Sequence, residues 1–204
     1  MLDSRLDPMA QVLLVCTGNI CRSPMAEGLL RSALERRLGD RAPRVASAGT
    51  IARDGARAMP EAVEAAAELG VDISRHSARR LRREHIRDAV LIVGMAAEHR
   101  QDVRALVPEA EARTFTLKEL VRVLEATDRR PMNATRDDGF LAGAVADANR
   151  RRAGSPATAE DDVMDPLGLS LHGYRAVASE VGDLCERLAG GLYDGSHVAS
   201  GRVD

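Results

Sequence analysis

The first apolar run of the chain, QVLLVC at 11–16, is short and continuous, and a polar turn follows it at once. Such a run predicts a strand that is buried on both faces. Beyond the turn, Ser23 and Pro24 suit the N-cap and the first position of a helix. The pattern predicts that this helix extends to about Arg37, because apolar residues recur at helical spacing, namely Met25, Leu29, Leu30, Ala33, Leu34 and Leu38.

Short apolar runs continue to alternate with amphipathic segments along the chain. Further strands are predicted at 44–48, 89–93 and 113–116, and further helices at 60–69, 98–106, 117–126 and 171–188. Strands that alternate with helices predict right-handed crossovers. The pattern therefore indicates an α/β fold, in which a parallel sheet carries helices on both faces.

The polarity of the chain changes between about 128 and 162. Two polar, turn-rich stretches, DRRPMNATRDD and RRRAGSPATAEDD, flank the segment GFLAGAVADAN. The flanks are predicted to be mobile loops and the middle a short helix. We therefore expect a flexible leader at 1–10, one domain at 11–195 with an insertion at 128–162, and a flexible tail at 196–204.

Composition narrows the class of protein. The 204 residues are 45% hydrophobic and 29% charged, which argues against a mainly disordered chain. A formal charge of −2 argues against a dedicated nucleic-acid binder. No apolar run approaches the ~20 residues of a membrane span, and the N-terminus has no apolar signal region. We therefore expect a cytoplasmic protein that binds neither nucleic acid nor a membrane.

Three cysteines, Cys16, Cys21 and Cys185, are too few for a disulfide framework, and their spacing does not fit a zinc site. We expect no metal and no cofactor. Cys16 and Arg22 instead bracket a C-x5-R loop, a pattern that is weak by itself because arginine is abundant in the chain. Its position adds weight, since a loop between a strand end and a helix start turns backbone N–H groups toward an anion and favours a thiolate.

The loop carries the groups that a nucleophilic attack on phosphorus requires. Gly18 permits a tight backbone path, and Arg22 offers a planar fork to two phosphate oxygens. A Cys16 thiolate in such a cradle is a nucleophile aimed at phosphorus. The leaving group then needs an acid. Asp165, stiffened by Pro166, is the best candidate in the sequence, although an Asp-Pro pair alone more often marks an ordinary turn in a loop.

Five segments occur in a fixed order along the chain: VLLVCTGNICRSPMAE, ASAG, ISRHSARRL, FTLKEL and DPLGLSLHGYR. Together they resemble the low molecular weight protein tyrosine phosphatase family, over about 11–128 and 163–190. The resemblance implies a four-stranded parallel sheet flanked by helices. It also implies a metal-free reaction in two steps. Cys16 attacks phosphorus while Asp165 protonates the leaving atom, and Asp165 then activates water against the cysteinyl phosphate.

The resemblance assigns roles to further residues. Ser23 would hydrogen-bond the Cys16 thiolate. Asn19, tied to Ser47 and His76, would hold the loop in shape, whereas without the resemblance His76 would be interpreted as a surface or capping histidine. The residues that would surround the phosphate are Thr17, Gly18, Asn19, Ile20, Cys21, Arg22 and Ser23.

The other two cysteines have different interpretations. In the family that this chain resembles, a cysteine at the position of Cys21 can form a reversible disulfide with the nucleophile under oxidation. The alternative is that Cys21 is a small core thiol. Cys185, on the last predicted helix, is expected in the core.

The substrate is expected to be a phosphorylated protein, and the phosphorylated residue is the open question. One branch of the family acts on phosphoarginine and typically has Thr where this chain has Ile20, so Ile20 favours phosphotyrosine. FTLKEL and DPLG are closer to the arginine branch, and Leu167 stands where the tyrosine branch often has an aromatic. Phe140 could line the slot, but a core position is the simpler interpretation. We expect a phosphotyrosine phosphatase, with arginine as the alternative.

Two further alternatives use the same loop differently. Arsenate reductases of similar fold relay electrons through additional cysteines, and only Cys185 remains for that purpose. A non-catalytic phosphate-binding module would not need Cys16, Arg22 and Asp165 together.

Overall fold

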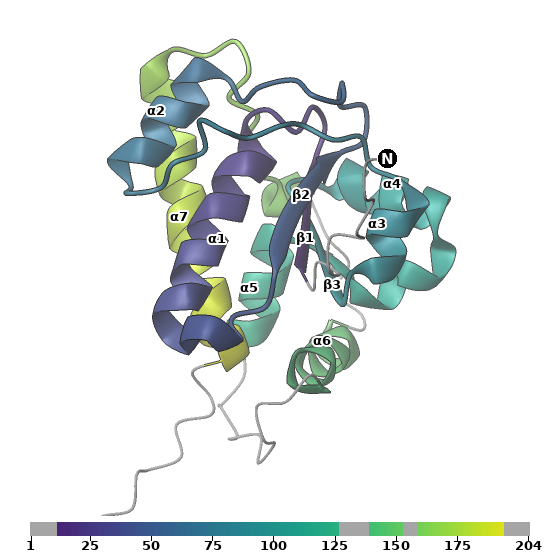
Figure 1. The fold of residues 1–204 in the computed structure, drawn as a ribbon. Coiled ribbons are helices and arrows are strands. Elements are labelled where there is room, and N and C mark those ends of the chain that lie inside the picture. Colours follow the sequence, from purple (N-terminus) through teal and green to yellow (C-terminus); the bar gives the residue numbers. More distant parts are fainter. Residues whose placement is uncertain (1–11, 127–138, 153–158, 194–204) are drawn as a thin grey trace, which may run out of the picture.

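The computed structural model describes residues 12–126, 139–152 and 159–193 (Figure 1). The predicted leader, the predicted tail and most of the polar flanks of the insertion lie outside the described residues. The elements are, in chain order, β1 (Val12–Cys16), α1 (Arg22–Leu38), η1 (Gly39–Arg41), β2 (Val45–Gly49), α2 (Pro60–Glu68), α3 (Arg83–Asp88), β3 (Leu91–Gly94), α4 (Ala97–Leu106), η2 (Pro108–Arg113), β4 (Thr114–Thr116), α5 (Leu117–Glu125), α6 (Gly139–Arg151), η3 (Ala159–Asp161) and α7 (Leu171–Tyr193).

The four strands form one parallel sheet in the order β2-β1-β3-β4. Val12 of β1 pairs with Val45 on one side and Leu91 on the other. The predicted α/β fold with a four-stranded parallel sheet is confirmed. Because the strands are parallel, their carboxyl ends lie at one edge of the sheet, where Cys16 ends β1 and Gly49 ends β2.

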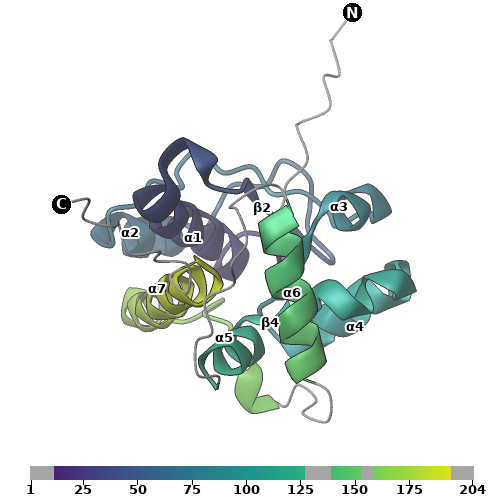
Figure 2. The same cartoon turned by 90° about the horizontal axis from the view of Figure 1, so that it is seen from below.

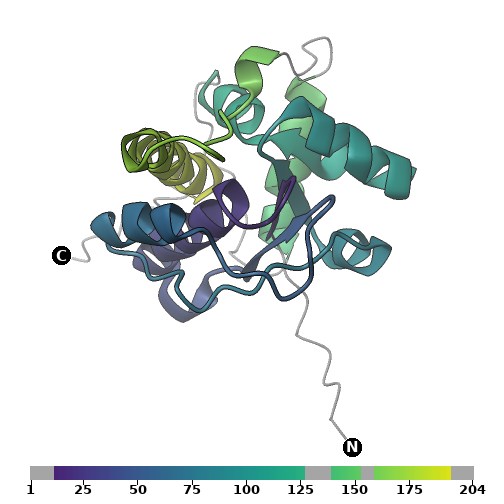
Figure 3. The same cartoon turned by 90° about the horizontal axis from the view of Figure 1, so that it is seen from above.

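β1 is buried on both faces, as its uninterrupted apolar sequence predicts. Leu14 faces a large cluster built with α1, α2, α5 and α7. Leu13 and Val15 face a smaller cluster built with α3 and α4. Figure 3, seen from above, shows these two groups of helices on opposite sides of the sheet. The loop that follows Cys16 therefore starts from a rigid, fully covered strand.

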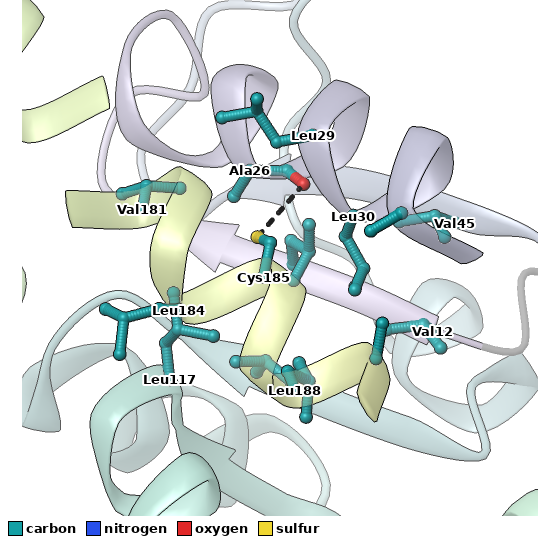
Figure 4. Close-up of a cluster of buried hydrophobic side chains, with 14 of the residues drawn as sticks. Val12, Ala26, Leu29, Leu30, Val45, Leu117, Val181, Leu184, Cys185 and Leu188 are labelled. Atoms are coloured by element: carbon teal, nitrogen blue, oxygen red, sulfur yellow. Dashed lines mark hydrogen bonds between the residues drawn. The ribbon is translucent and has the colours of Figure 1, made fainter. Parts of the chain in front are cut away.

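The larger cluster is centred on the contact between α1 and α7 (Figure 4). Cys185 is fully buried there, with its Sγ 3.7 Å from the Ala26 carbonyl oxygen. Burial raises the pKa of this thiol, so Cys185 is a core residue, as predicted. Although α7 spans 23 residues, none of the helices in the described part of the chain is long and apolar enough to cross a membrane.

Two details around the third strand differ from the sequence prediction. The strand covers Leu91–Gly94 rather than 89–93. A short helix, α3, precedes it and was not predicted. Of its six residues only Ile86 is buried, which leaves no apolar periodicity by which a helix could be recognised.

A helix, α6, is present in the middle of the insertion, where one was predicted. Ala142 and Val145 of α6 line a groove together with Ala89 and Val90, which precede β3. Since the strands are parallel, this is the end of the sheet opposite to Cys16, and Figures 1 and 2 show α6 across that lower end. α6 therefore does not cover the Cys16 loop.

Phe140 belongs to the core rather than to the Cys16 loop. Its ring is buried and stacks on Tyr193 of α7, with 5.4 Å between the ring centroids. This contact fastens α6 to the C-terminal turn of the longest helix. The possibility that Phe140 lines the phosphate slot is thereby excluded.

Candidate active site

The residues between β1 and α1 form a tight loop around the Cys16 thiol. Cys16 is 2% exposed, and the backbone N–H of Asn19 donates to its Sγ at 3.2 Å. α1 begins at Arg22, and no side chain caps its first N–H groups. A helix start of this kind binds anions through those N–H groups and the positive end of the helix dipole.

Ser23 is buried and contacts the thiol directly. Its Oγ lies 2.9 Å from Cys16 Sγ and accepts a hydrogen bond from Asn19 Nδ2 at 2.8 Å. Because Asn19 supplies the proton on that side, the Ser23 hydroxyl proton is left to point at the sulfur. A donor in that position stabilises a thiolate, which is the contact that the resemblance implies.

The start of α1 corrects the prediction that Ser23 is the N-cap and Pro24 the first helical residue. The helix begins one residue before Ser23. The Ser23 hydroxyl faces Cys16 and Asn19 instead of the N–H groups of the helix. Pro24 is tolerated as the third helical residue, because a proline in the first turn removes no helical hydrogen bond.

Asn19 holds the loop in an unusual backbone shape. Its φ is 55°, in the left-handed region that residues other than glycine rarely adopt. Its buried Nδ2 donates to Ser23 Oγ and Ser47 Oγ, each at 2.8 Å, and its Oδ1 accepts from the Arg79 N–H at 2.9 Å. His76 Nε2 donates to the Asn19 carbonyl at 2.9 Å. The structure thus brings Asn19, Ser47 and His76 together.

Two residues that the sequence analysis missed complete this network. Glu27 of α1 accepts from the Ser47 hydroxyl at 2.6 Å, which leaves the Ser47 lone pairs to face Asn19. Arg79 donates from Nε to the Ser47 carbonyl at 2.6 Å, besides its backbone bond to Asn19. Both lie inside segments that carry the resemblance, Glu27 at the end of VLLVCTGNICRSPMAE and Arg79 within ISRHSARRL, but residue type alone gave no signal that either side chain reaches Ser47.

Arg22 is almost fully buried, and its guanidinium is held from three sides. Nη1 donates to the Val163 carbonyl at 3.2 Å. Nη2 donates to Thr17 Oγ1 at 3.2 Å and to Asp165 Oδ2 at 2.5 Å. A guanidinium fixed in this way is a pre-oriented fork for an oxyanion.

Asp165 reaches Arg22 from a segment 143 residues further along the chain. Its Oδ1 accepts from the Leu167 N–H at 3.1 Å, and Gly168 has a φ of 85°, so the chain turns back directly after the carboxylate. The Asp165 side chain is 45% exposed, whereas that of Arg22 is 6% exposed. The carboxylate therefore lies between the buried guanidinium and the entrance, where a leaving group would be.

Cys16, Arg22 and Asp165 meet at the carboxyl edge of the sheet. They combine a thiol beside a helix start, a fixed guanidinium and a partly exposed carboxyl group. The first can attack phosphorus, the second can hold its equatorial oxygens, and the third can exchange a proton with the leaving group.

Comparison with known proteins agrees with this chemistry. The family model for the low molecular weight phosphotyrosine protein phosphatases matches residues 11–134. The chain belongs to this family. It is a protein phosphatase, and the reaction typical of the family uses a cysteine.

The relatives of this phosphatase act on two kinds of phosphorylated residue, according to their names. A protein-arginine-phosphatase from Geobacillus stearothermophilus is 31% identical over 88% of this chain and 93% of its own length. A probable low molecular weight protein-tyrosine-phosphatase, EpsP from Ralstonia solanacearum, is 41% identical over 53% of this chain and 71% of its own length. A low molecular weight protein tyrosine phosphatase structure from T. tengcongensis superposes with a TM-score of 0.64, at 34% identity, covering 87% of this chain and 95% of that one.

Three large apolar side chains are exposed on the segments that carry the phosphatase site. Ile51 is 69% exposed, and its N–H donates to the Thr17 carbonyl at 3.1 Å, which places it beside the loop. Met164 and Leu167, 55% and 56% exposed, stand on either side of Asp165 in the sequence. Exposed apolar side chains that gather at a site indicate a binding surface. We call these three residues the apolar rim.

Cys21 is a buried thiol of the phosphatase loop. Its Sγ lies 3.5 Å from the Tyr174 hydroxyl of α7. Burial raises the pKa of Cys21 to about 11, so this thiol is protonated near neutral pH. The geometry is that of a core thiol, and a reversible disulfide with Cys16 stays a prediction.

Gly49, the last residue of β2, lets the phosphatase loop pass against the strand. A Cβ here would lie 2.6 Å from the Thr17 carbonyl oxygen and 2.8 Å from the Asn19 nitrogen. Both are backbone atoms, which cannot swing aside as the end of a side chain can. The glycine of the ASAG motif is therefore a steric requirement of the loop.

Replacing Gly49 by alanine is expected to deform the loop. Overpacking of this kind costs about 2 kcal/mol of stability, or roughly 6 °C in melting temperature for a domain of this size. Turnover should fall more than about tenfold, because the displaced Asn19 no longer orients Ser23. Calorimetry and an aryl phosphate assay measure the two effects. Gly182→Ala is the matched control, since its Cβ would meet Leu69 at an ordinary 3.6 Å; similar losses in both variants would contradict the steric argument.

Proposed function

We propose that this phosphatase hydrolyses phosphotyrosine in proteins through a cysteinyl-phosphate intermediate. The apolar rim is the observation that carries the choice of tyrosine. Ile51, Met164 and Leu167 offer an aliphatic surface beside the acid and the loop, and a flat phenol ring buries its faces well against such a surface. Ile20 adds a further apolar side chain within the loop.

The first step transfers the phosphoryl group to the enzyme. The Cys16 thiolate, stabilised by the Ser23 hydroxyl and the Asn19 N–H, attacks phosphorus. An S–P bond forms while the P–O bond to tyrosine breaks. Asp165 donates its proton to the departing phenol oxygen, so the leaving group departs as neutral tyrosine. Arg22 and the loop N–H groups hold the equatorial oxygens throughout.

The second step returns the enzyme to its starting state. A water molecule attacks the cysteinyl phosphate and passes a proton to the Asp165 carboxylate. A P–O bond forms, the S–P bond breaks, and the sulfur leaves as a thiolate. The hydrogen bond from Ser23 favours this step as well, because it stabilises the departing sulfur. Inorganic phosphate is the product.

Phosphoarginine is a second candidate substrate, favoured by the similarity to the Geobacillus protein-arginine-phosphatase over 88% of this chain. The same residues would serve, with Asp165 protonating a guanidino nitrogen as the P–N bond breaks. Arsenate reduction has less support, because Cys185 is fully buried between α1 and α7 and Cys21 contacts Tyr174.

We also propose that the protein works in the cytoplasm on phosphorylated proteins, without nucleic acid or a membrane as partner. The three cysteines are free and buried, which suits a reducing compartment. The near-neutral formal charge of −2 offers no general attraction to nucleic acid.

A phosphotyrosine peptide is expected to turn over at least about tenfold faster, as kcat/KM, than a phosphoarginine peptide of the same sequence. Replacing Ile20 by threonine should shift this ratio toward phosphoarginine by about tenfold, since a hydroxyl can hydrogen-bond the guanidinium and a methyl group cannot. Ile20→Val is the matched control, because valine has nearly the shape of threonine without the hydroxyl. Faster turnover of the arginine peptide by the unchanged protein would overturn the proposal.

A further inference from the structure

His99 of α4 is a buried imidazole that points at the phosphatase loop from another element. It is 1% exposed, and its Nε2 lies 3.0 Å from Thr17 Oγ1. Among the described residues its Nδ1 has no hydrogen-bond partner. α4 can approach β3 this closely because Gly94, which ends β3, has no side chain. A Cβ at Gly94 would lie only 3.1 Å from the His99 Cβ.

Thr17 connects this imidazole to Arg22. Arg22 Nη2 can only donate, so Thr17 Oγ1 accepts that bond at 3.2 Å. The Thr17 hydroxyl proton must then go to another acceptor. His99 Nε2 lies at 3.0 Å, a normal length, whereas Glu98 Oε1 lies at 3.5 Å, the limit of a hydrogen bond. The proton is therefore best placed on the line to His99 Nε2.

This direction requires a neutral ring, and the surroundings provide one. Burial, together with the positive charge of Arg22, lowers the pKa of His99 to about 4, against a smaller opposite effect of Asp165. His99 is therefore neutral over the range in which a phosphatase operates. Nε2 is the acceptor in the tautomer that carries its proton on Nδ1, the one that fits the direction of the Thr17 hydroxyl.

We propose that His99 is a positioning residue of this phosphatase, which accepts a hydrogen bond from the Thr17 hydroxyl and thereby turns the Thr17 lone pairs toward Arg22. The chain of contacts runs from His99 through Thr17 to the Arg22 guanidinium and on to Asp165. These contacts hold the plane of the guanidinium in one orientation. The inference rests on the phosphatase activity, but not on the choice between tyrosine and arginine, because Arg22 holds the phosphoryl group in both cases.

The test uses a pair of variants that differ by one methylene. His99→Gln places an amide group where Nε2 now lies, whereas His99→Asn reaches only the position of Nδ1. His99→Asn is expected to lower kcat for an aryl phosphate about tenfold and to change KM less than threefold, because the bonds from Arg22 strengthen in the transition state. His99→Gln is expected to remain within threefold of the unchanged protein. Equal losses in the two variants would overturn the proposal.

A double-mutant cycle identifies the route of the effect. If His99 acts through Thr17, the double variant His99→Asn/Thr17→Val should be no slower than Thr17→Val alone. Losses that multiply would show that His99 acts in another way and would overturn the proposal. His85→Asn is the matched control, a half-buried imidazole that accepts from the Arg82 N–H on α3, and it should leave kcat unchanged.

Orthovanadate binding separates a failure of this inference from a failure of the proposed function. Vanadate copies the five-coordinate phosphorus of the transition state, so its affinity should fall about tenfold in His99→Asn and stay within threefold in His99→Gln. This readout needs no turnover. An unchanged protein that binds vanadate but hydrolyses neither phosphopeptide would count against the proposed function, and the same vanadate comparison would still decide the role of His99.

Discussion

Replacing Cys16 by serine is expected to abolish turnover of a phosphotyrosine peptide, with a loss on the order of 10⁴-fold or more. An alcohol stays protonated where a thiol ionises, and the loop contains no base for it. The groups that contact Cys16 Sγ, the Ser23 hydroxyl at 2.9 Å and the Asn19 N–H at 3.2 Å, are not basic enough to remove the proton of a serine in its place. The loop should still bind phosphate, because Arg22 and the loop N–H groups are unchanged.

Phosphate release measures the loss, and calorimetry with inorganic phosphate measures the remaining binding. Cys185→Ala is the matched control, since it removes a thiol that is buried between α1 and α7. That variant should melt at a lower temperature and keep its turnover. A Cys16→Ser protein that retains more than about 1% of the activity would show that Cys16 is not the nucleophile.

Replacing Asp165 by asparagine is expected to lower kcat for a phosphotyrosine peptide by roughly 10²–10³-fold, the usual contribution of a general acid. The loss should be much smaller for p-nitrophenyl phosphate, because its more acidic phenol leaves without needing a proton. Asparagine keeps the shape of the side chain and an oxygen for the Leu167 N–H. The difference in the loss of kcat between the two substrates therefore measures the missing proton donor and not a disturbed turn after residue 165.

The same substitution also removes the ion pair with Arg22, and the two effects can be separated. Loss of the ion pair alone would slow both substrates equally. Asp162→Asn is the matched control, because its carboxylate accepts from the Ala97 N–H at 2.7 Å and holds the same segment in place. That variant should show a small loss that does not depend on the leaving group. Equal losses for both substrates in Asp165→Asn would contradict its role as the acid.

Most of the fold could be predicted from the sequence because each strand and each long helix carries its own local pattern. QVLLVC has no polar interruption, and β1 is buried on both faces. The exceptions are one short helix and one residue whose role depends on contacts made only in the folded chain. α3 buries one residue of six and so has no period to detect. Ser23 looks like a cap by residue type, but its hydroxyl is used on Cys16, a demand that arises only when the loop closes.

The site divides in the same way. Cys16, Arg22 and Ser23 could be placed together from sequence, because they share one loop between a strand end and a helix start. Asp165 could be named as a candidate, but not set against Arg22 from 143 residues away. Glu27 and Arg79 lie within the segments that carry the resemblance but were assigned no role, because only the fold brings them to Ser47. His99 was missed because it approaches the loop from α4 and belongs to none of those segments.

The sequence by itself determined the α/β fold and indicated the anion-binding loop and the candidate nucleophile, since local periodicity and adjacent residues are enough for these. Tertiary structure decided the rest. Hydrogen-bond direction depends on which donors and acceptors surround an atom in space. Only the closed fold holds Asn19 at a φ of 55° by bonds from two other segments, one with Ser47 and one with His76 and Arg79. Only the closed fold also brings Asp165 and the His99–Thr17 pair to the same nitrogen, Nη2, of Arg22.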